Sequence, residues 1–141
     1  MRIVILVIFG VLAVGGFIAM SIDAPGRKEI QQLSFSNGEL PKLNDGTFIG
    51  EYTGTKSHLR DTKVEVRISG GEISDVKIVK GALDKEGKPL VMTKGKSIQT
   101  IFDDVQKKRT LQVDVISGAT LTSKTHLKAL ENALEQAWVK E

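Results

Sequence analysis

Cysteine is absent from the 141 residues of the chain, and aromatic residues make up only 5 % of it. The lack of cysteine excludes disulfide bonds, thiolate metal sites, thiol redox chemistry and a lipid-modified N-terminal cysteine. Any redox role therefore requires a bound cofactor. The few aromatic residues give no base-stacking surface, and a net charge of +3 is too small to indicate a nucleic-acid partner. The two histidines, His58 and His126, share no metal-ligand spacing, so we predict no metal site.

Charged residues are missing from one long stretch near the N-terminus. The run from Ile3 to Met20 holds 18 consecutive apolar or glycine residues, and a helix of this length would span about 27 Å, close to the hydrocarbon thickness of a bilayer. We therefore predict a transmembrane anchor over residues 1–22. Arg2 favours a cytoplasmic N-terminus, although two basic residues shortly after the run weaken that orientation.

A cleaved signal peptide is the alternative interpretation of this run. Ala19-Met20-Ser21 places small residues at a spacing that a signal peptidase accepts. We favour the anchor because the run exceeds the roughly 7–15 residues of a signal-peptide core. Both interpretations export the rest of the chain. With the anchor retained, we expect a single-pass protein of the cell membrane whose C-terminal domain is extracytoplasmic.

Residues 23–44 have the composition of a linker. Two prolines and two glycines interrupt a mixed polar stretch, which we interpret as a tether with one helical turn near residues 29–33. Asp45-Gly46 is a turn pair, and we place the start of a single folded domain there, over residues 45–141. A domain of this size can bury one modest core.

Strand patterns fill the first half of the predicted domain. Residues 62–69 alternate between apolar and polar side chains, which is typical of a half-buried antiparallel strand. Gly70-Gly71 follows, a favoured hairpin turn because both positions tolerate positive φ, and residues 73–80 return as the partner strand. Residues 47–55 are predicted as a further strand. The buried face of the alternating strand is expected to consist of Val64, Val66 and Ile68.

Helical patterns occupy most of the second half. Residues 98–109 place apolar side chains at i, i+3, i+4 and i+7, which is the pattern of a helix with one buried face. A short apolar stretch over residues 110–116 is predicted as a fourth strand, and a last helix from Thr122 or Ser123 to about residue 139. The order β-β-β-α-β-α predicts an α+β fold, a small antiparallel sheet with packed helices, preceded by the N-terminal transmembrane helix.

A turn rich in small and hydroxyl-bearing residues joins the predicted fourth strand to the last helix. Its sequence is Asp114-Val115-Ile116-Ser117-Gly118-Ala119-Thr120-Leu121-Thr122-Ser123. Such a turn directs backbone N–H groups and hydroxyls to one place, and a helix N-terminus is a favourable site for phosphate. Gly118 and Ala119 would let a ligand approach the backbone closely. Taken alone, these residues also suit an ordinary turn with a helix cap.

The pattern D-x-x-S-G-A-T followed by L-T-S, over Asp114 to Ser123, resembles the flavin-attachment signature of the FMN-binding domain family. That domain occurs in the C subunit of sodium-pumping NADH:quinone reductase, in the G subunit of the related electron-transport complex, and in small membrane-anchored proteins. The resemblance covers Asp45 to about Ala137. This chain has Val115 where the family often has alanine, which is a mild departure.

The resemblance implies that FMN is held at this turn, covalently, by a phosphoester between its phosphate and the hydroxyl of Thr120. In the family a flavin transferase makes this bond, and the carboxylate of Asp114 would belong to what the transferase recognises. The other cofactor-binding residues implied are Ser117, Gly118, Ala119, Leu121, Thr122 and Ser123. The candidates for the apolar surface against the flavin ring are Leu121, Ile116, Phe48 and Tyr52.

Two other patterns do not support an active site. Gly95-Lys96-Ser97 is like the end of a phosphate-binding loop, but Leu90 occupies the position of the required glycine. An Asp-Ser-His triad lacks the nucleophile elbow, and we expect His126 to be solvated on the surface of the last helix. We therefore predict no catalytic residues.

We accordingly expect an electron carrier more than an enzyme with its own substrate. The partners implied are the flavin transferase for maturation, redox donor and acceptor proteins or a quinone-linked membrane complex, and the membrane itself. One alternative is a tethered ligand-binding or structural module without covalent flavin. A reductase whose small substrate reaches the flavin directly ranks last, because no general acid stands at a recognisable spacing.

Overall fold

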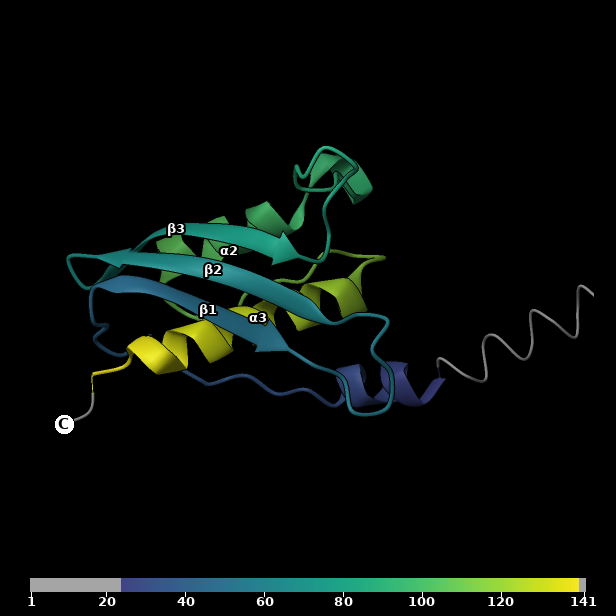
Figure 1. Cartoon of the computed structure of the whole chain (residues 1–141), viewed down its shortest axis with the longest axis horizontal. Coiled ribbons are helices and arrows are strands. Elements are labelled where there is room, and N and C mark those ends of the chain that lie inside the picture. Colours follow the sequence, from purple (N-terminus) through teal and green to yellow (C-terminus); the bar gives the residue numbers. More distant parts are fainter. Residues whose placement is uncertain (1–23, 140–141) are drawn as a thin grey trace, which may run out of the picture.

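The computed structural model describes residues 24–139, in which three strands form one antiparallel sheet in the order β1-β2-β3. Residues 24–31 are helical. α3 packs against β1 and β2 while α2 packs against β3, so both helices lie on one face of the sheet (Figure 1). The α+β fold with helices on a small antiparallel sheet is thus confirmed. The elements are β1 (Gly46–Tyr52), β2 (Thr62–Ser69), β3 (Glu72–Lys80), the 3₁₀ turn η1 (Thr93–Gly95), α2 (Ile98–Lys108) and α3 (Thr120–Ala137).

The predicted membrane anchor at residues 1–22 lies outside the described residues. Between residues 24 and 139, none of the helices has the length and apolar character that crossing a bilayer requires. The anchor therefore stays a prediction from the sequence.

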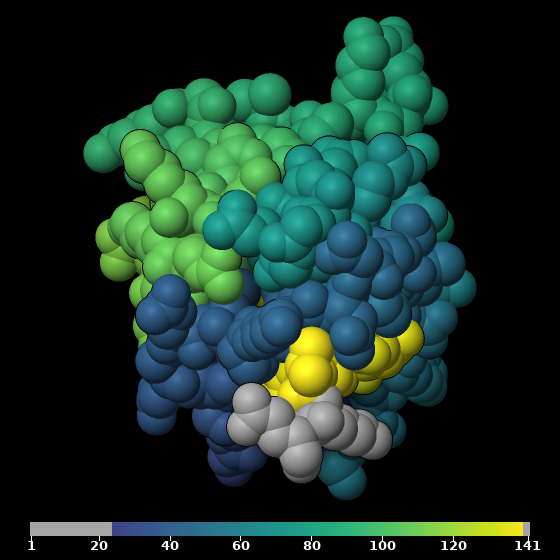
Figure 2. Space-filling model, turned by 90° about the vertical axis from the view of Figure 1, so that its left-hand side faces the viewer, coloured from purple at the N-terminus to yellow at the C-terminus, as the bar shows by residue number. Residues whose placement is uncertain are grey.

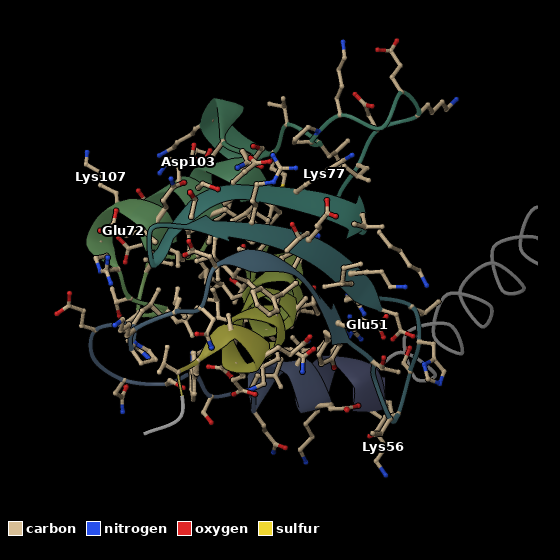
Figure 3. The ribbon with its side chains drawn as sticks, turned by 60° about the vertical axis from the view of Figure 1, so that its left-hand side comes forward. Glu51, Lys56, Glu72, Lys77, Asp103 and Lys107 are labelled. Carbon is tan, nitrogen blue, oxygen red and sulfur yellow. The ribbon has the colours of Figure 1, made fainter. Side chains whose placement is uncertain are left out.

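The core lies between the sheet and the two helices, and the alternation along β2 decides which side chains enter it. Val64 and Val66 are fully buried and stand opposite Ile78 and Val76 of β3, as the pattern predicts. Each fully buried aliphatic side chain of this kind contributes about 1.5–3 kcal/mol to stability. The outer face of the sheet is polar, and Figure 3 shows Lys77 pointing away from the helices.

The turn between β2 and β3 also follows the prediction. Gly70 and Gly71 both have positive φ, 65° and 79°, which is the conformation of a two-residue hairpin turn that matches the twist of the strands. Glu72 pairs with Ser69 immediately after it. The hairpin is therefore determined by residues that are neighbours in the sequence.

The predicted fourth strand over residues 110–116 does not form, so that prediction is wrong. The segment is irregular, and the N–H of Val113 donates to the carbonyl of Leu111 at 3.0 Å instead of to a neighbouring strand. A strand needs a partner strand, and this segment pairs with neither edge strand of the sheet, β1 or β3. At the β1 edge, Gln136 of α3 donates to the carbonyl of Ile49 at 2.8 Å. The apolar side chain of Leu111 is buried all the same, because core packing does not require a ladder.

The last helix begins earlier than predicted, at Thr120 instead of Thr122 or Ser123. The reason is that the side chain of Ser123 bonds to backbone groups of the preceding turn, so the chain is already helical when it reaches Ser123. Thr120 therefore stands in the first turn of α3 and not in the loop before it. The helix ends at Ala137.

Residues 24–44, which we predicted to be a tether, pack against the domain. Ile30, Leu40 and Leu43 are buried in the core. The carbonyl of Gln31 accepts from Lys124 at 3.1 Å, and further along the segment Leu43 forms a β-bridge with Trp138. The segment thus runs beside α3 in the same direction as α3, which places residues 24–31 at the end of the molecule where α3 begins (Figure 1).

Candidate functional site

The turn that precedes α3 has a fixed backbone geometry. The N–H of Ala119 donates to the carbonyl of Ile116 at 2.9 Å, and Gly118 at the third position of this turn has φ +82°. A positive φ at that position is the signature of a type II turn, which favours glycine. A Cβ atom on Gly118 would lie 3.5 Å from Oγ1 of Thr93, so the loop that carries η1 runs close beside the turn.

Ser123 holds this turn against the first turn of α3. Its hydroxyl donates to the carbonyl of Ala119 at 2.7 Å and accepts from the N–H of Ile116 at 3.2 Å. The side chain is fully buried. Both bonding directions of the hydroxyl are therefore used within the protein, so Ser123 shapes the site and does not itself offer a contact to a ligand.

Thr120 is exposed as the first residue of α3. No side chain caps this helix, and the N–H groups of Thr120, Leu121 and Thr122 lack intrahelical partners, because the first turn of any helix has none. These donors and the positive end of the helix dipole favour an anion. The Thr120 hydroxyl consequently lies beside a ready binding site for phosphate.

Two shallow hollows flank the turn and contain basic side chains. One, of about 370 Å³, is lined by residues 118–122 and Arg60. The other, of about 460 Å³, lies across the turn and is lined by Asp114 to Ser117 together with Lys94 and Lys96. Basic side chains from loops distant in sequence therefore lie on both sides of the turn. Asp114, Ser117 and Gly118 are exposed on the rim.

A third hollow, of about 250 Å³, continues from Arg60 and Thr122 and contains large apolar side chains. Leu59, Leu90 and Met92 line it, and Leu59 and Leu90 are exposed. A flat aromatic group anchored at Thr120 would find apolar surface here. The sequence alone did not point to these three residues, since they stand in loops without a periodic pattern.

Only one of the four residues predicted to face a flavin ring lines the hollow at Thr120, and that residue is Leu121. Ile116 and Tyr52 are buried in the core, with 4 % and 7 % of their surface exposed, so little of either side chain is left to contact a ring. Phe48 packs against the core on β1. Alternation along β1 turns Phe48 and Tyr52 toward the core, whereas Ile116 is buried from an irregular segment.

His126 is buried and not solvated, which corrects the sequence-based expectation. Its Nε2 accepts from the N–H of Ala82 at 3.0 Å, so Nδ1 carries the proton and donates to the carbonyl of Thr122 at 2.7 Å. Burial lowers the pKa of His126 to about 4. The imidazole is thus neutral at pH 7 and joins the loop after β3 to the first turn of α3. No local pattern reveals this role, because Ala82 is 44 residues away.

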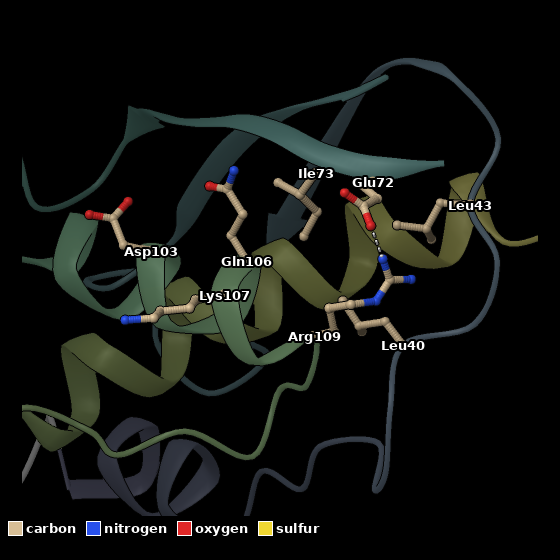
Figure 4. Close-up of a pocket in the computed structure, with 8 residues that line it drawn as sticks. All are labelled: Leu40, Leu43, Glu72, Ile73, Asp103, Gln106, Lys107 and Arg109. Carbon is tan, nitrogen blue, oxygen red and sulfur yellow. Dashed lines mark hydrogen bonds and ion pairs between the residues drawn. The ribbon is translucent and has the colours of Figure 1, made fainter. Parts of the chain in front are cut away.

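Another hollow, of about 440 Å³, lies at the opposite end of the molecule (Figure 4). Figure 2 looks onto this end, where the β2–β3 hairpin, the C-terminal end of α2 and the segment before β1 meet. Arg109 pairs there with Glu72 at 2.7 Å, and its Nε lies 3.4 Å from Glu39. Oppositely charged side chains already neutralise one another here, and none of the predicted site residues lines this hollow.

The fold and the site together define a small domain that presents the exposed hydroxyl of Thr120 at the N-terminus of a helix. The family model of the FMN-binding domain matches residues 14–135, and the chain belongs to this family. We expected the resemblance to start at Asp45. The match starts earlier, at residue 14, and so includes the segment that packs along α3. Comparison with curated proteins and with solved structures gives no match.

The residues present fit FMN. The phosphate would meet the free N–H groups of α3 with Arg60 in the same hollow, and the ring would have the apolar hollow of Leu59, Leu90 and Met92 within the same surface. No cluster of potential metal ligands occurs among residues 24–139.

Proposed function

We propose that this protein is a membrane-anchored, extracytoplasmic flavoprotein that holds FMN covalently at Thr120 and carries electrons in a membrane redox chain. The observation that carries the proposal is the position of Thr120. Its side chain is exposed at the N-terminus of α3, in a hollow shared with Arg60, within a chain of the FMN-binding domain family.

The covalent step would be a phosphoryl substitution. The Thr120 oxygen would form a bond to the phosphorus of an activated FMN donor while the bond to the donor's leaving group breaks, and the hydroxyl proton would pass to a base. The product would weigh the mass of the chain plus FMN less one water. The covalent bond would retain FMN outside the cytoplasm, where a cofactor that dissociates cannot easily be replaced.

The base for this step is expected to come from a separate flavin transferase. His126 is the nearest histidine in sequence, but both of its ring nitrogens are bonded to the backbone and its pKa is lowered to about 4 by burial. It is therefore not placed to take a proton from Thr120. Asp114, exposed on the rim, would serve recognition by the transferase during maturation.

Bound FMN would supply the redox chemistry, and the protein would supply attachment, orientation and charge. Such a domain would pass electrons between donor and acceptor proteins or a quinone-linked complex. The anchor over residues 1–22 would keep it at the cell membrane with its C-terminal domain outside the cytoplasm.

The test is the intact mass and visible absorbance of the full chain co-produced with a flavin transferase. We expect the mass to rise by FMN less water and the yellow colour to survive denaturation. Thr120→Ala should abolish both, whereas Thr47→Ala, an exposed threonine on β1, should leave both intact.

An unmodified, colourless parent chain made in the presence of an active transferase would contradict the proposal. The protein would then be better described as a tethered ligand-binding or structural module. Colour that is lost on denaturation, with an unmodified mass, would show non-covalent FMN and would overturn the phosphoester alone.

A further inference from the structure

Several loops that are distant in sequence meet at the end of the molecule where α3 begins. We call this the Thr120 end and define it as residues 24–31, 53–61, 80–97 and 113–124. Arg60 shares a hollow with Thr120, and Gly26 lies directly against Ser57. In Figure 3 Lys56 lies at this end, while Glu72 and Lys107 lie at the other.

Exposed apolar side chains are concentrated at the Thr120 end. Within residues 24–139 six large hydrophobic side chains are exposed, and four of them are here: Leu59 at 74 %, Val91 at 68 %, Leu90 at 44 % and Val115 at 36 %. They stand on three separate loops. A cluster of exposed apolar side chains at loop tips is typical of a surface that contacts another protein or a membrane.

The Thr120 end is also strongly basic. It contains ten lysines and arginines against five aspartates and glutamates, although the whole chain has a net charge of only +3. Lys94 and Lys96 lie beside the exposed Val115 in one hollow, and Arg60 lies beside Leu59 in another. Basic residues interleaved with exposed apolar ones suit an interface of anionic headgroups over hydrocarbon.

The chain itself brings this end close to the membrane. Only residues 21–23 separate Met20, the last residue of the apolar run, from residue 24. Four Cα–Cα steps of 3.8 Å reach at most about 15 Å. Since residues 24–31 belong to the Thr120 end, an anchor over residues 1–22 would hold this end next to the bilayer and the hairpin end away from it.

We propose that the Thr120 end is a membrane-docking surface that rests on the anionic lipid headgroups around the anchor. The lysines and arginines attract the headgroups, and the apolar side chains of Leu59, Leu90 and Val91 enter the interface. Thr120 then faces the membrane surface and not the bulk solvent. The proposal rests on the anchor of the proposed function, but not on flavin attachment.

The test uses the full, flavin-free chain in vesicles of phosphatidylcholine with phosphatidylglycerol, some of whose headgroups carry a nitroxide. Because the chain has no cysteine, a single introduced one carries the only fluorophore. We expect the label at Val91→Cys to be quenched several-fold more than the label at Lys107→Cys, which is exposed at the opposite end.

A matched pair of double variants distinguishes electrostatic docking of the Thr120 end from attachment through the anchor alone. In the Val91→Cys background, Lys94→Glu with Lys96→Glu should reduce the quenching, as should high salt or vesicles of phosphatidylcholine alone. Lys107→Glu with Lys108→Glu should not. The melting temperature of each variant, compared with that of the parent, shows that the fold is intact.

Equal quenching at both positions, or quenching that ignores lipid charge and salt, would overturn the proposal. A Val91 label that stays unquenched in vesicles but is shielded by an added membrane protein would assign this end to a protein partner instead. If the chain does not remain bound to the vesicles, both the proposed anchor and the proposed docking surface are contradicted. The proposal of covalent flavin is tested separately, by the intact mass of the chain co-produced with a flavin transferase.

Discussion

Ser123 determines the shape of the turn that presents Thr120. Ser123→Ala would remove the hydroxyl bond to Ala119 and leave the buried N–H of Ile116 without a partner. We expect a loss of about 1–3 kcal/mol in the free energy of unfolding, measured by urea denaturation. Ser117→Ala, at an exposed position of the same turn, should change this free energy much less, and equal losses would contradict the role of Ser123.

His126 makes stability depend on pH in a defined range. The folded state holds its pKa at about 4, below the ordinary 6.5, so between these values the unfolded state binds more protons. Stability should therefore be complete above about pH 6.5 and fall by up to about 3 kcal/mol as the pH drops to about 4.

Urea unfolding at a series of pH values would check this dependence. His126→Gln should lose the slope between pH 6.5 and 4, even if its stability at pH 7 is lower. His58→Gln replaces an exposed histidine and should keep the slope. A parent protein whose stability is flat through this range would show that His126 is not held neutral by the fold.

Among the elements, α3 approaches β1 so closely that only glycine fits at residue 50. A Cβ atom there would fall on the carbonyl of Ala129 and on Ala133. Gly50→Ala should force the helix and strand apart at a cost of roughly 1–3 kcal/mol, seen as a lower melting temperature. Thr47→Ala on the same strand, where the side chain is exposed, provides the control. An unchanged melting temperature in Gly50→Ala would mean that the contact is looser than the structure indicates.

The elements that were predictable are those specified by neighbouring residues. The alternation of β2 and the Gly70-Gly71 turn define the hairpin locally, and the spacing of apolar residues defines α2. The segment over residues 110–116 has the composition of a strand but pairs with neither edge strand of the sheet, β1 or β3. Pairing is a property of the whole fold, so composition alone could not predict this outcome.

The candidate site likewise has features that the sequence predicts and features that it does not. The turn that presents Thr120 could be predicted from the motif, although the helix begins at Thr120 itself and not at Thr122 or Ser123. The roles of Arg60, Leu59 and His126 could not, because each depends on loops that meet only in three dimensions. Ile116 and Tyr52 were predicted to face the flavin ring from their apolar character, which is also what buries them in the core.

At the scale of the whole molecule, Glu29 connects the N-terminal segment to the loop that carries Arg60. Its carboxylate accepts from the N–H groups of Thr55 and Lys56 at 3.0 Å each, and these backbone bonds lower the pKa of Glu29. Glu29→Gln should speed amide hydrogen exchange at Thr55 and Lys56.

Glu39→Gln is the matched control, because Glu39 pairs with Arg109 at the opposite end. It should leave exchange at Thr55 and Lys56 unchanged. If Glu29→Gln also leaves exchange unchanged, the segment and the loop are held together by other contacts, such as that between Gly26 and Ser57.

The cover that α3 provides over β1 has a consequence for self-association. Asn132 accepts from the N–H of Glu51 at 3.0 Å and Gln136 donates to the carbonyl of Ile49 at 2.8 Å, so an incoming strand finds these backbone groups already bonded. Growth of a sheet from molecule to molecule needs two open edges, whereas this sheet offers β3 alone. Any edge-to-edge pairing therefore stops at two copies, and the fold resists fibre formation by its connectivity.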